Sequence, residues 1–247
     1  LCIFVSCETQ LIEAINDNNR KQTDVLFLYF SKAFDKVSHR KLLYKLDYYG
    51  VRGKTNKWIQ GFLDGRTQMV SVNGTTSQSA EVLSGVPQGS VLGPALFLLY
   101  INDINEGVGS TMRLFADDSV LYRQISSVED QKLLHQDLQR VFNWAERWDM
   151  KFNVTKCTHV TISLKNKLLF YSYTIRDQAI PKEKSCKYLG VQIAENLSWN
   201  AQTEQVRAKA AKTLGLIRRT FGKCDQSVRE TAYNTLVRPQ VEYATSP

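Results

Sequence analysis

The stretch LFLYFSKAFDKV occupies residues 26–37 and begins with five apolar or aromatic residues in a row. A short apolar run that ends in a polar turn is typical of a strand buried on both faces of a sheet. We therefore expect a central strand over 26–30. The turn that follows, 31–35, is suited to holding phosphate oxygens on its backbone amides, with Phe34 standing over a sugar.

The composition of the chain is that of an ordinary folded protein. Of its 247 residues, 43% are hydrophobic and 23% are charged, which is enough for a sizeable core. No apolar run approaches the roughly 18 residues of a membrane span, and the first ten residues, LCIFVSCETQ, do not resemble a signal peptide. We expect a soluble intracellular protein without a membrane partner. The five cysteines have neither disulfide nor zinc spacing, so buried or incidental thiols are the better interpretation.

The net charge of +8 is unevenly distributed along the chain. Residues 20–66 hold eleven Lys and Arg against four acids, residues 201–247 hold eight against four, and residues 67–200 are balanced. Two basic arms around a neutral centre suit a polyanion that lies across the molecule. Ordinary solvated surface charge explains the same pattern, and composition alone does not separate the two.

Patterning along the chain predicts a mixture of strands and helices, then helices alone. Residues 38–50 predict a helix capped by Ser38, and residues 55–65 a second one with Trp58, Ile59 and Phe62 inward. Residues 67–83 predict a hairpin around Asn73 and Gly74. Residues 90–104 read as a buried helix, 112–122 as strand, turn, strand, and 158–164 and 187–193 as further strands.

Two later regions carry the strongest helical periodicity. Leu134, Leu138, Val141, Ala145 and Trp148 recur at helical spacing behind a capping box formed by Ser126 and Glu129. From Asn200 onward, Val206, Ala210, Leu214, Ile217 and Phe221 predict one long basic helix, and residues 227–239 predict a second that Pro239 ends. The change near residue 200 is the one candidate domain boundary.

The segment FADD, residues 115–118, lies between two apolar strands. Neighbouring side chains of a strand point to opposite faces, so Asp117 and Asp118 can serve one site only at a bend, which a hairpin tip provides. Two close carboxylates raise each other's pKa unless a cation lies between them, and Mg²⁺ suits such a pair. The plain alternative is an Asp-Asp turn that faces solvent.

The segment SGVPQGSVLGP, residues 84–94, contains three glycines and two prolines around Gln88. This composition predicts a shaped loop that brings backbone and a carboxamide close to a flat ligand. No Lys-Ser or Lys-Thr follows its last glycine, so it is not a P-loop.

Taken in order, these segments resemble the palm of the reverse transcriptases of non-LTR (LINE-type, jockey-like) retrotransposons. The resemblance covers nearly the whole chain and rests on the motifs FSKAFDKVSH, SGVPQGSVLGPALFLLYINDI, LFADDSVLY, WAERWDMKFNVTKC, KYLGV and KAAKTLGLIRR with VRPQVEYA. It implies an α+β fold, a palm of antiparallel sheet backed by helices. The implied divisions are a fingers remnant over 1–24, a palm over 25–199 with a finger-side insert at 38–82, and the start of a helical thumb over 200–247.

The resemblance also implies a role for individual residues. Catalysis would involve Asp117, Asp118, position 29 and Lys156, and Lys156 would protonate the leaving pyrophosphate. The metal ligands would be Asp117, Asp118 and the Phe30 backbone, and the nucleotide would contact Lys32, Ala33, Phe34, Gln88 and Gly89. The primer would be gripped by Tyr188, Leu189 and Gly190, and nucleic acid would be contacted by Arg207, Lys209, Lys212, Arg218 and Arg219. The implied cofactors are two Mg²⁺ (or Mn²⁺) ions. The implied partners are an RNA template, a DNA primer and deoxynucleoside triphosphates, with no protein partner inferable. The family resemblance implies a nuclear location.

One position departs from the family pattern. The first motif of the family reads D-F-S-K-A-F-D, whereas this chain has Tyr29 in place of the first Asp. A phenol with a pKa near 10 does not replace that carboxylate, and neither Asp24 nor Asp35 is expected to reach the site. The chain also has LCIFV where the family carries basic finger residues, and it stops with the thumb barely begun, as in a fragment of a decayed element.

Three functional hypotheses follow. The first is a working RNA-directed DNA polymerase domain that uses Asp117 and Asp118 alone. The second is a nucleic-acid-binding pseudo-polymerase, and the third is a transposon fossil without selected function. Tyr29 argues against the first, so we expect a degenerate reverse transcriptase domain.

Overall fold

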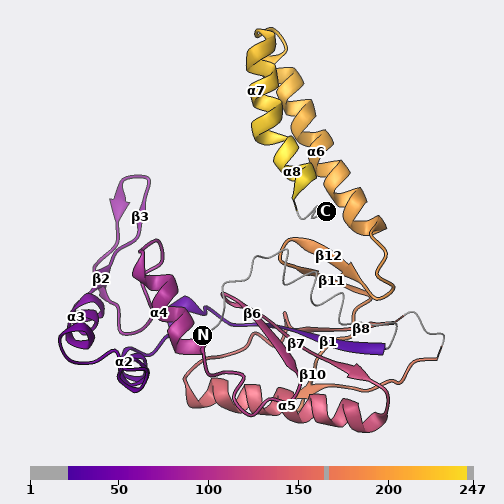
Figure 1. Cartoon of the computed structure of the whole chain (residues 1–247). Helices are drawn as coiled ribbons and strands as arrows, with labels where there is room; N and C mark the ends of the chain where they lie inside the picture. The colour runs from indigo at the N-terminus through magenta and orange to yellow at the C-terminus, as the bar shows by residue number, and fades with distance from the viewer. Residues whose placement is uncertain (1–21, 164–166, 244–247) are drawn as a thin grey trace.

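The computed structural model describes residues 22–163 and 167–243. At its centre is an antiparallel sheet of four strands in the order β6-β7-β1-β8 (Figure 1). The strands are β6 (Thr111–Phe115), β7 (Asp118–Ile125), β1 (Gln22–Tyr29) and β8 (Thr158–Ile162). The predicted central strand is confirmed, and it begins at Gln22, earlier than the apolar run. The prediction of Cys2 and Cys7 as incidental thiols lies outside the described residues.

Strand β1 is buried on both faces because each face has its own cover. Leu26 and Leu28 pack into the larger apolar core, with side chains of α4 (Leu92–Ile101) and α5 (Val128–Arg147). Val25 and Phe27 pack into a second core, beneath a hairpin of β11 (Ser185–Tyr188) and β12 (Val191–Ala194). In Figure 1, α5 runs along one side of the sheet and the hairpin lies on the other. This double cover explains why the strand is continuously apolar from Val25 to Leu28.

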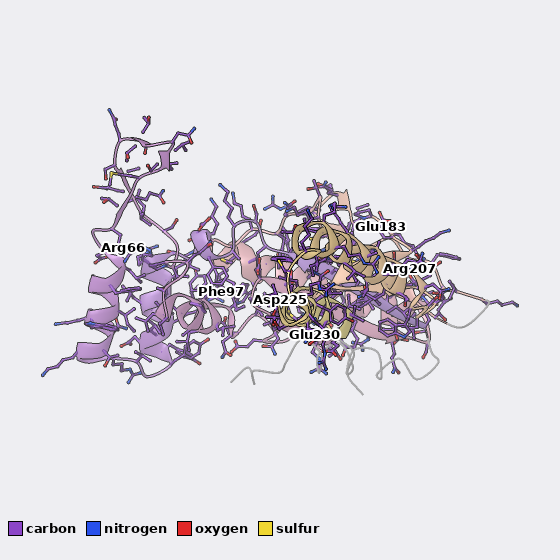
Figure 2. All side chains as sticks on the ribbon, turned by 90° about the horizontal axis from the view of Figure 1, so that it is seen from above. Arg66, Phe97, Glu183, Arg207, Asp225 and Glu230 are labelled. Atoms are coloured by element: carbon purple, nitrogen blue, oxygen red, sulfur yellow. The ribbon has the colours of Figure 1, made fainter. Side chains whose placement is uncertain are left out.

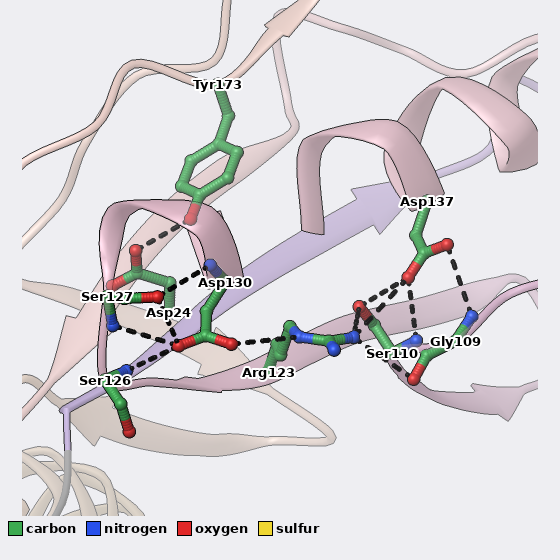
Figure 3. A network of polar contacts seen from close by, with 9 residues as sticks. All are labelled: Asp24, Gly109, Ser110, Arg123, Ser126, Ser127, Asp130, Asp137 and Tyr173. Carbon is green, nitrogen blue, oxygen red and sulfur yellow. Dashed lines mark hydrogen bonds and ion pairs between the residues drawn. The ribbon is translucent and has the colours of Figure 1, made fainter. Parts of the chain in front are cut away.

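Helix α5 has the predicted inward face, with Leu134, Leu138, Val141 and Ala145 buried. Its predicted cap is wrong by one residue: Ser127, rather than Ser126, is the N-cap residue, and Asp130, rather than Glu129, completes the capping box (Figure 3). The Asp130 carboxylate accepts from the backbone amides of both Ser126 and Ser127 at 2.9 Å. Both registers read Ser-x-x-acid, so only the position of the first helical turn decides between them.

Residues 38–83 form a unit beside the sheet, made of two helices and a ribbon (Figure 1). Trp58 is 61% exposed, so its predicted inward position is wrong. The inward position of Ile59 is confirmed, Phe62 is partly buried against the core, and Leu63 joins Ile59 on the buried face. Ser38 is at the N-cap position but makes no side-chain cap bond. The hairpin around Asn73 and Gly74 is confirmed. The elements are α2 (His39–Tyr48), α3 (Gly53–Leu63), β2 (Thr67–Gln68), β3 (Ser71–Val72), β4 (Thr75–Thr76) and β5 (Ala80–Glu81).

After β12 the described chain is entirely helical, as the sequence predicts. Helices α6 (Asn200–Phe221), α7 (Gln226–Leu236) and α8 (Arg238–Glu242) form a column that stands over the sheet, apart from the unit that carries Arg66 (Figures 1 and 2). Pro239 does not end α7, because it lies in the first turn of α8, where proline is tolerated. Three short elements complete the fold: η1 (Phe34–Lys36), β9 (Thr174–Ile175) and β10 (Gln178–Ala179).

Within the described ranges, no helix has both the length and the apolar character needed to cross a bilayer.

Candidate functional site

The tip of the β6–β7 hairpin carries the two adjacent carboxylates. Phe115 pairs with Asp118, so Ala116 and Asp117 form the turn, and Ala116 has a left-handed backbone with φ of 50°. Asp117 is exposed at the tip, whereas Asp118 is half-buried as the first residue of β7. The predicted bend is confirmed, and it is the feature that allows both carboxylates to serve one site.

Asp118 lies between two aromatic residues in the sheet. Its direct partner on β1 is Tyr29, and its direct partner on β6 is Phe115. Opposed residues of an antiparallel pair share a face with Cα atoms about 4.5–5.5 Å apart. Tyr29 and Phe115 both pack against the core beneath the β11–β12 hairpin, so the Asp118 side chain is on this face too. Position 29 is therefore next to the carboxylate pair, as the sequence predicts.

The Tyr29 side chain is hydrogen-bonded to the β11–β12 hairpin. Its hydroxyl donates to the Lys187 carbonyl oxygen at 3.1 Å. Cys186 Sγ is 3.8 Å from the Tyr29 hydroxyl oxygen. Burial, together with the neighbouring Cys186 and Asp118, raises the pKa of the Tyr29 phenol well above its ordinary value. Tyr29 is consequently a neutral hydrogen-bond donor at physiological pH, with no negative charge to offer a cation.

The two adjacent carboxylates of the hairpin tip repel each other. Burial, and then the charge of Asp117, raise the pKa of the Asp118 carboxyl. In the described part of the chain, no three His, Cys, Asp or Glu side chains are grouped so that they could hold a metal ion. Two carboxylates beside an engaged phenol do not fit a two-ion site, which needs a bridging acid. The donors that the structure brings together here are therefore the two carboxylates alone.

Asp24 does not stand in for the missing acid, as predicted. It is fully buried on β1, where its carboxylate accepts from the Tyr173 hydroxyl at 2.7 Å (Figure 3). Gln131 Nε2 donates to the same carboxylate at 3.1 Å. Asp35 is also engaged elsewhere, because Gln88 Nε2 donates to its Oδ1 at 3.2 Å. Neither acid is in contact with Asp118.

Two loops that are far apart in sequence come together just beyond β1. The amide of Val86 donates to the Phe34 carbonyl at 2.9 Å, and the amide of Gly85 donates to the Val37 carbonyl at 2.8 Å. A Cβ added at Gly85 would be 2.8 Å from the Asp35 Cα, so this close approach requires glycine. The structure thereby joins the predicted nucleotide residues of the first motif to those of the second.

Within this pair of loops, each predicted nucleotide residue has a defined environment. Phe34 stacks on Phe97 of α4 with ring centroids 4.4 Å apart. Lys32 is exposed and has φ of 53°, Ala33 is buried, and Gly89 has φ of 78° with open space around it. Together with the Asp35–Gln88 contact, this makes the loops one surface at the end of the sheet that carries Asp118.

Lys156 belongs to a turn that abuts the same end of β1. The amide of Asn153 donates to the Tyr29 carbonyl at 2.7 Å, and the amide of Lys156 donates to the Asn153 carbonyl at 2.9 Å. The Lys156 side chain is exposed. Phe30, whose backbone is the third predicted ligand, forms an isolated bridge with Phe152 of this segment.

The predicted primer-grip residues form the turn of the β11–β12 hairpin. Tyr188 is buried against Phe27, with ring centroids 5.6 Å apart, so its side chain is part of the core. Leu189 and Gly190 form the turn with φ of 47° and 83°. Of the three predicted primer-grip residues, Gly190 alone is exposed, whereas Tyr188 and Leu189 are buried.

The five basic residues predicted to contact nucleic acid are not gathered at the site. They are spread along α6, which leads away from the sheet (Figure 1). All are exposed, and Arg207 is paired with Glu204 at 2.8 Å. The set consists of Arg207, Lys209, Lys212, Arg218 and Arg219.

Sequence reasoning missed the contacts that depend on the hairpin. Neither Lys187, whose carbonyl accepts from Tyr29, nor Phe115, which flanks Asp118, was identified. Tyr243, which donates to the Leu189 carbonyl at 2.8 Å, was also missed. The spacing of FADD indicates Phe115 in retrospect, since it precedes the turn by one residue, whereas no local signal marks the other two.

The chain matches a known protein family and is similar to known proteins. The family described as "Reverse transcriptase (RNA-dependent DNA polymerase)" matches residues 4–193. The chain is 30% identical over 242 residues to the probable RNA-directed DNA polymerase from transposon X-element of Drosophila melanogaster. It is 28% identical over 238 residues to the RNA-directed DNA polymerase from mobile element jockey of the same species. These alignments cover 92% and 91% of the chain but 26% of each relative, so the chain spans about a quarter of their length.

A solved structure shows the same fold. The telomerase of Candida tropicalis, in complex with a fragment of telomeric RNA, superposes with a TM-score of 0.55 at 9% identity, over 96% of this chain and 42% of that one. At this identity the likeness concerns the fold alone, which is that of a polymerase palm.

Proposed function

This chain belongs to the reverse transcriptase (RNA-dependent DNA polymerase) family, and from that premise we propose that it is the palm and first thumb helices of an RNA-directed DNA polymerase of a non-LTR retrotransposon. In this proposal it binds an RNA template with a DNA primer and takes deoxynucleoside triphosphates as substrates. Its catalytic step is impaired by Tyr29. The observation that carries the proposal is that Tyr29, and no carboxylate, is the direct partner of Asp118.

The proposed reaction is nucleotidyl transfer. The primer 3′-hydroxyl oxygen attacks the α-phosphorus of the nucleotide, the bond from that phosphorus to the β-phosphate oxygen breaks, and pyrophosphate leaves. The exposed Lys156 is proposed to donate a proton to that leaving group. The two loops would contact the nucleotide through Lys32, Ala33, Phe34, Gln88 and Gly89, and the turn formed by Leu189 and Gly190, after Tyr188, would support the primer.

Reverse transcriptases generally use divalent metal ions, and an intact site would hold two Mg²⁺ or Mn²⁺ ions. Because the donors present here do not fit that pair, no step is assigned to a metal in this chain. We propose that an Asp at position 29 completes the set with Asp117 and Asp118. The phenol instead donates to the hairpin, which keeps the hairpin on the sheet but supplies no charge.

A second candidate function is template–primer binding without catalysis. It is supported by the same contact, because the Tyr29–Lys187 hydrogen bond preserves the hairpin while the metal site is lost. The exposed basic residues of α6 suit phosphate contacts in either function. A nuclear location, where an element copies itself into DNA, is part of the same proposal.

The deciding experiment is primer extension on an RNA template with Mg²⁺ or Mn²⁺, comparing the chain with Tyr29→Asp and with Tyr29→Asn. Asn matches Asp in size but has no charge, so it separates the carboxylate from the removal of a ring. We expect extension by Tyr29→Asp alone. Equal extension by the unaltered chain would show that the third carboxylate is dispensable and that the account of the site is wrong.

The same preparations are used for a binding measurement. Fluorescence anisotropy of a labelled RNA–DNA hybrid is expected to show tight binding at low salt and a steep loss as salt rises, because bound counterions are released. Salt-dependent binding without extension by any variant would favour the second candidate. The lack of binding at low salt would contradict both.

A further inference from the structure

The helical column is attached to the palm at two points on the same hairpin. It leaves from β12, and near its start Gln202 of α6 accepts a hydrogen bond from the Gln192 amide through Oε1 at 2.9 Å. It returns after α8, where the Tyr243 hydroxyl donates to the Leu189 carbonyl at 2.8 Å. The whole excursion of α6, α7 and α8 therefore begins and ends on the β11–β12 hairpin.

The second attachment is a close fit as well as a hydrogen bond. A Cβ added at Gly190 would be 3.0 Å from Tyr243 Cε1 and 3.2 Å from its hydroxyl oxygen. The Tyr243 ring therefore packs against the backbone of Gly190, and it can approach so closely only because glycine has no side chain. Gly190 also has φ of 83°, which glycine adopts without strain.

The helical column has a small buried core of its own. Among its described residues only Ile217 and Val237 are buried. Between α6 and the α7–α8 pair there is a groove of about 880 Å³, lined by Val206, Leu214 and Tyr233 among others, and bordered at its base by Tyr243. With so little apolar surface removed from water, hydrogen bonds at the two attachments have a large share in fixing the tilt.

The hairpin whose backbone accepts a hydrogen bond from Tyr243 also accepts one from Tyr29. Lys187 and Leu189 are two residues apart, and their carbonyls accept from Tyr29 on β1 and from Tyr243 after α8, respectively. One short hairpin thus links the strand next to Asp118 with the end of the helical column.

We propose that Tyr243 is a positioning residue that latches the helical column onto the Leu189–Gly190 turn, and that this latch sets the angle of the column over the palm. It is not a catalytic residue, because it acts through the hairpin. The consequence for nucleic-acid binding rests on the proposed function, since the basic residues of α6 reach a template–primer only at the latched angle. The latch itself does not depend on that function.

The test measures the angle without nucleic acid. Spin labels on Cys224, which is exposed between α6 and α7, and on Val128→Cys at the start of α5 report the distance between column and palm. The full chain is used with Cys2→Ser and Cys7→Ser; Cys157 and Cys186 are buried. We expect one narrow distance distribution for this background and a broad or second distribution for Tyr243→Phe, which keeps the ring but loses the donor.

Matched variants separate the latch from general damage. Tyr233→Phe also removes a hydroxyl from the column, one that makes no hydrogen bond to another described residue, and should leave the distance unchanged. Gly190→Ala should broaden the distribution, whereas Gly74→Ala, with a similar φ of 80° but no atom within 4 Å of an added Cβ, should not. A distribution for Tyr243→Phe identical to that of the background would overturn the proposal.

A binding measurement then distinguishes the two proposals. If both hold, Tyr243→Phe weakens binding of a labelled RNA–DNA hybrid by about 3–10-fold, the effect of losing one hydrogen bond. If distances broaden but no variant binds the hybrid, the latch stands and the proposed function fails. If the hybrid binds and the distances do not change, the latch is wrong and the proposed function stands.

Discussion

Tyr29 and Asp118 are direct partners in the antiparallel pair of β1 and β7, on the face of the sheet that the β11–β12 hairpin covers. The tyrosine hydroxyl donates to the Lys187 carbonyl at 3.1 Å. The residue that departs from the family pattern therefore has a structural partner of its own. This relationship makes the effects on stability and on catalysis separable.

Tyr29→Phe removes only the hydroxyl, so it should lower the free energy of unfolding by about 1 kcal/mol, the cost of leaving the Lys187 carbonyl without its donor. Tyr29→Asp should cost more in the absence of divalent ions, because a third carboxylate joins Asp117 and Asp118. Denaturant titration measures both. Added Mg²⁺ or Mn²⁺ should restore part of the loss in Tyr29→Asp and none in Tyr29→Phe; equal responses to the ions would contradict the assignment of the site.

Lys45 on α2 is a buried cation, 2% exposed. Its ammonium donates to the Tyr100 carbonyl at 2.6 Å and pairs with Asp103. The same ammonium lies 3.8 Å from the Trp148 ring centroid. Lys45→Met should lower the free energy of unfolding by about 3 kcal/mol, because it leaves Asp103 without its cation. Lys54→Met, at an exposed position on α3, should change it by less than about 0.5 kcal/mol. Similar small effects for both would show that the buried pair is not stabilising.

The same lysine predicts a pH dependence. Burial lowers the pKa of Lys45 to about 8 from an ordinary 10.5. The unfolded chain therefore binds more protons between pH 8 and 10.5, so the free energy of unfolding should rise across this window relative to the Lys45→Met variant. Urea titrations of the two proteins from pH 7 to 11 measure the difference, at about 1.4 kcal/mol for each unit of pKa shift. A flat difference would contradict the burial of a charged Lys45.

Asp24 should contribute to acid sensitivity. Burial raises the pKa of its carboxyl, but the His159 imidazole 3.7 Å away and hydrogen bonds from Gln131 and Tyr173 outweigh burial, and the net pKa is lowered from 3.8. Stability from this group is therefore present above pH 3.8 and lost as the pH falls through the lower folded-state pKa. Asp24→Asn should lower stability at neutral pH by about 3 kcal/mol and flatten the acid limb of the curve. An unchanged acid limb in Asp24→Asn would assign the transition to other carboxyls.

The N-terminus of α5 offers a test of which serine caps it. Ser127→Ala should lower the free energy of unfolding by about 1 kcal/mol, because the Ser127 hydroxyl accepts from the Asp130 amide. Ser126→Ala should change it by less than about 0.5 kcal/mol, since Ser126 contributes its backbone amide, which alanine retains. Thermal unfolding of the two variants under one condition suffices; a larger loss for Ser126→Ala would favour the capping box expected from the sequence.

The exposed basic residues of α6 should determine the salt dependence of template–primer binding. Lys209→Gln with Lys212→Gln removes two exposed charges and should reduce the slope of log affinity against log salt by about 1.5–2. Lys132→Gln, on α5 beneath the sheet, should leave the slope within about 0.5 of its original value. Anisotropy titrations at several salt concentrations provide the slopes. A matching loss for the α5 control would mean that the charge acts over the whole molecule rather than through α6.

Several features were predictable because they depend on neighbours in the chain. The apolar run at 26–30, the Asn73–Gly74 hairpin, the bend at Asp117 and the long helix from Asn200 all arise from local periodicity or turn chemistry. The errors are of another kind. Trp58 is exposed and Ile59 and Leu63 are buried because the neighbouring elements, and not the helix pattern alone, choose the inward face of α3.

By itself, the sequence determined the family, the central strand and hairpin that carry Tyr29 and Asp118, and the departure from an acid at position 29, because each is written in consecutive residues. Only the tertiary structure decided what Tyr29 does, since its partner Lys187 is 158 residues away. The same holds for Tyr243 and Leu189, which are 54 residues apart. Such contacts depend on how whole elements are registered against one another, and packing of the complete fold, rather than any local preference, sets that register.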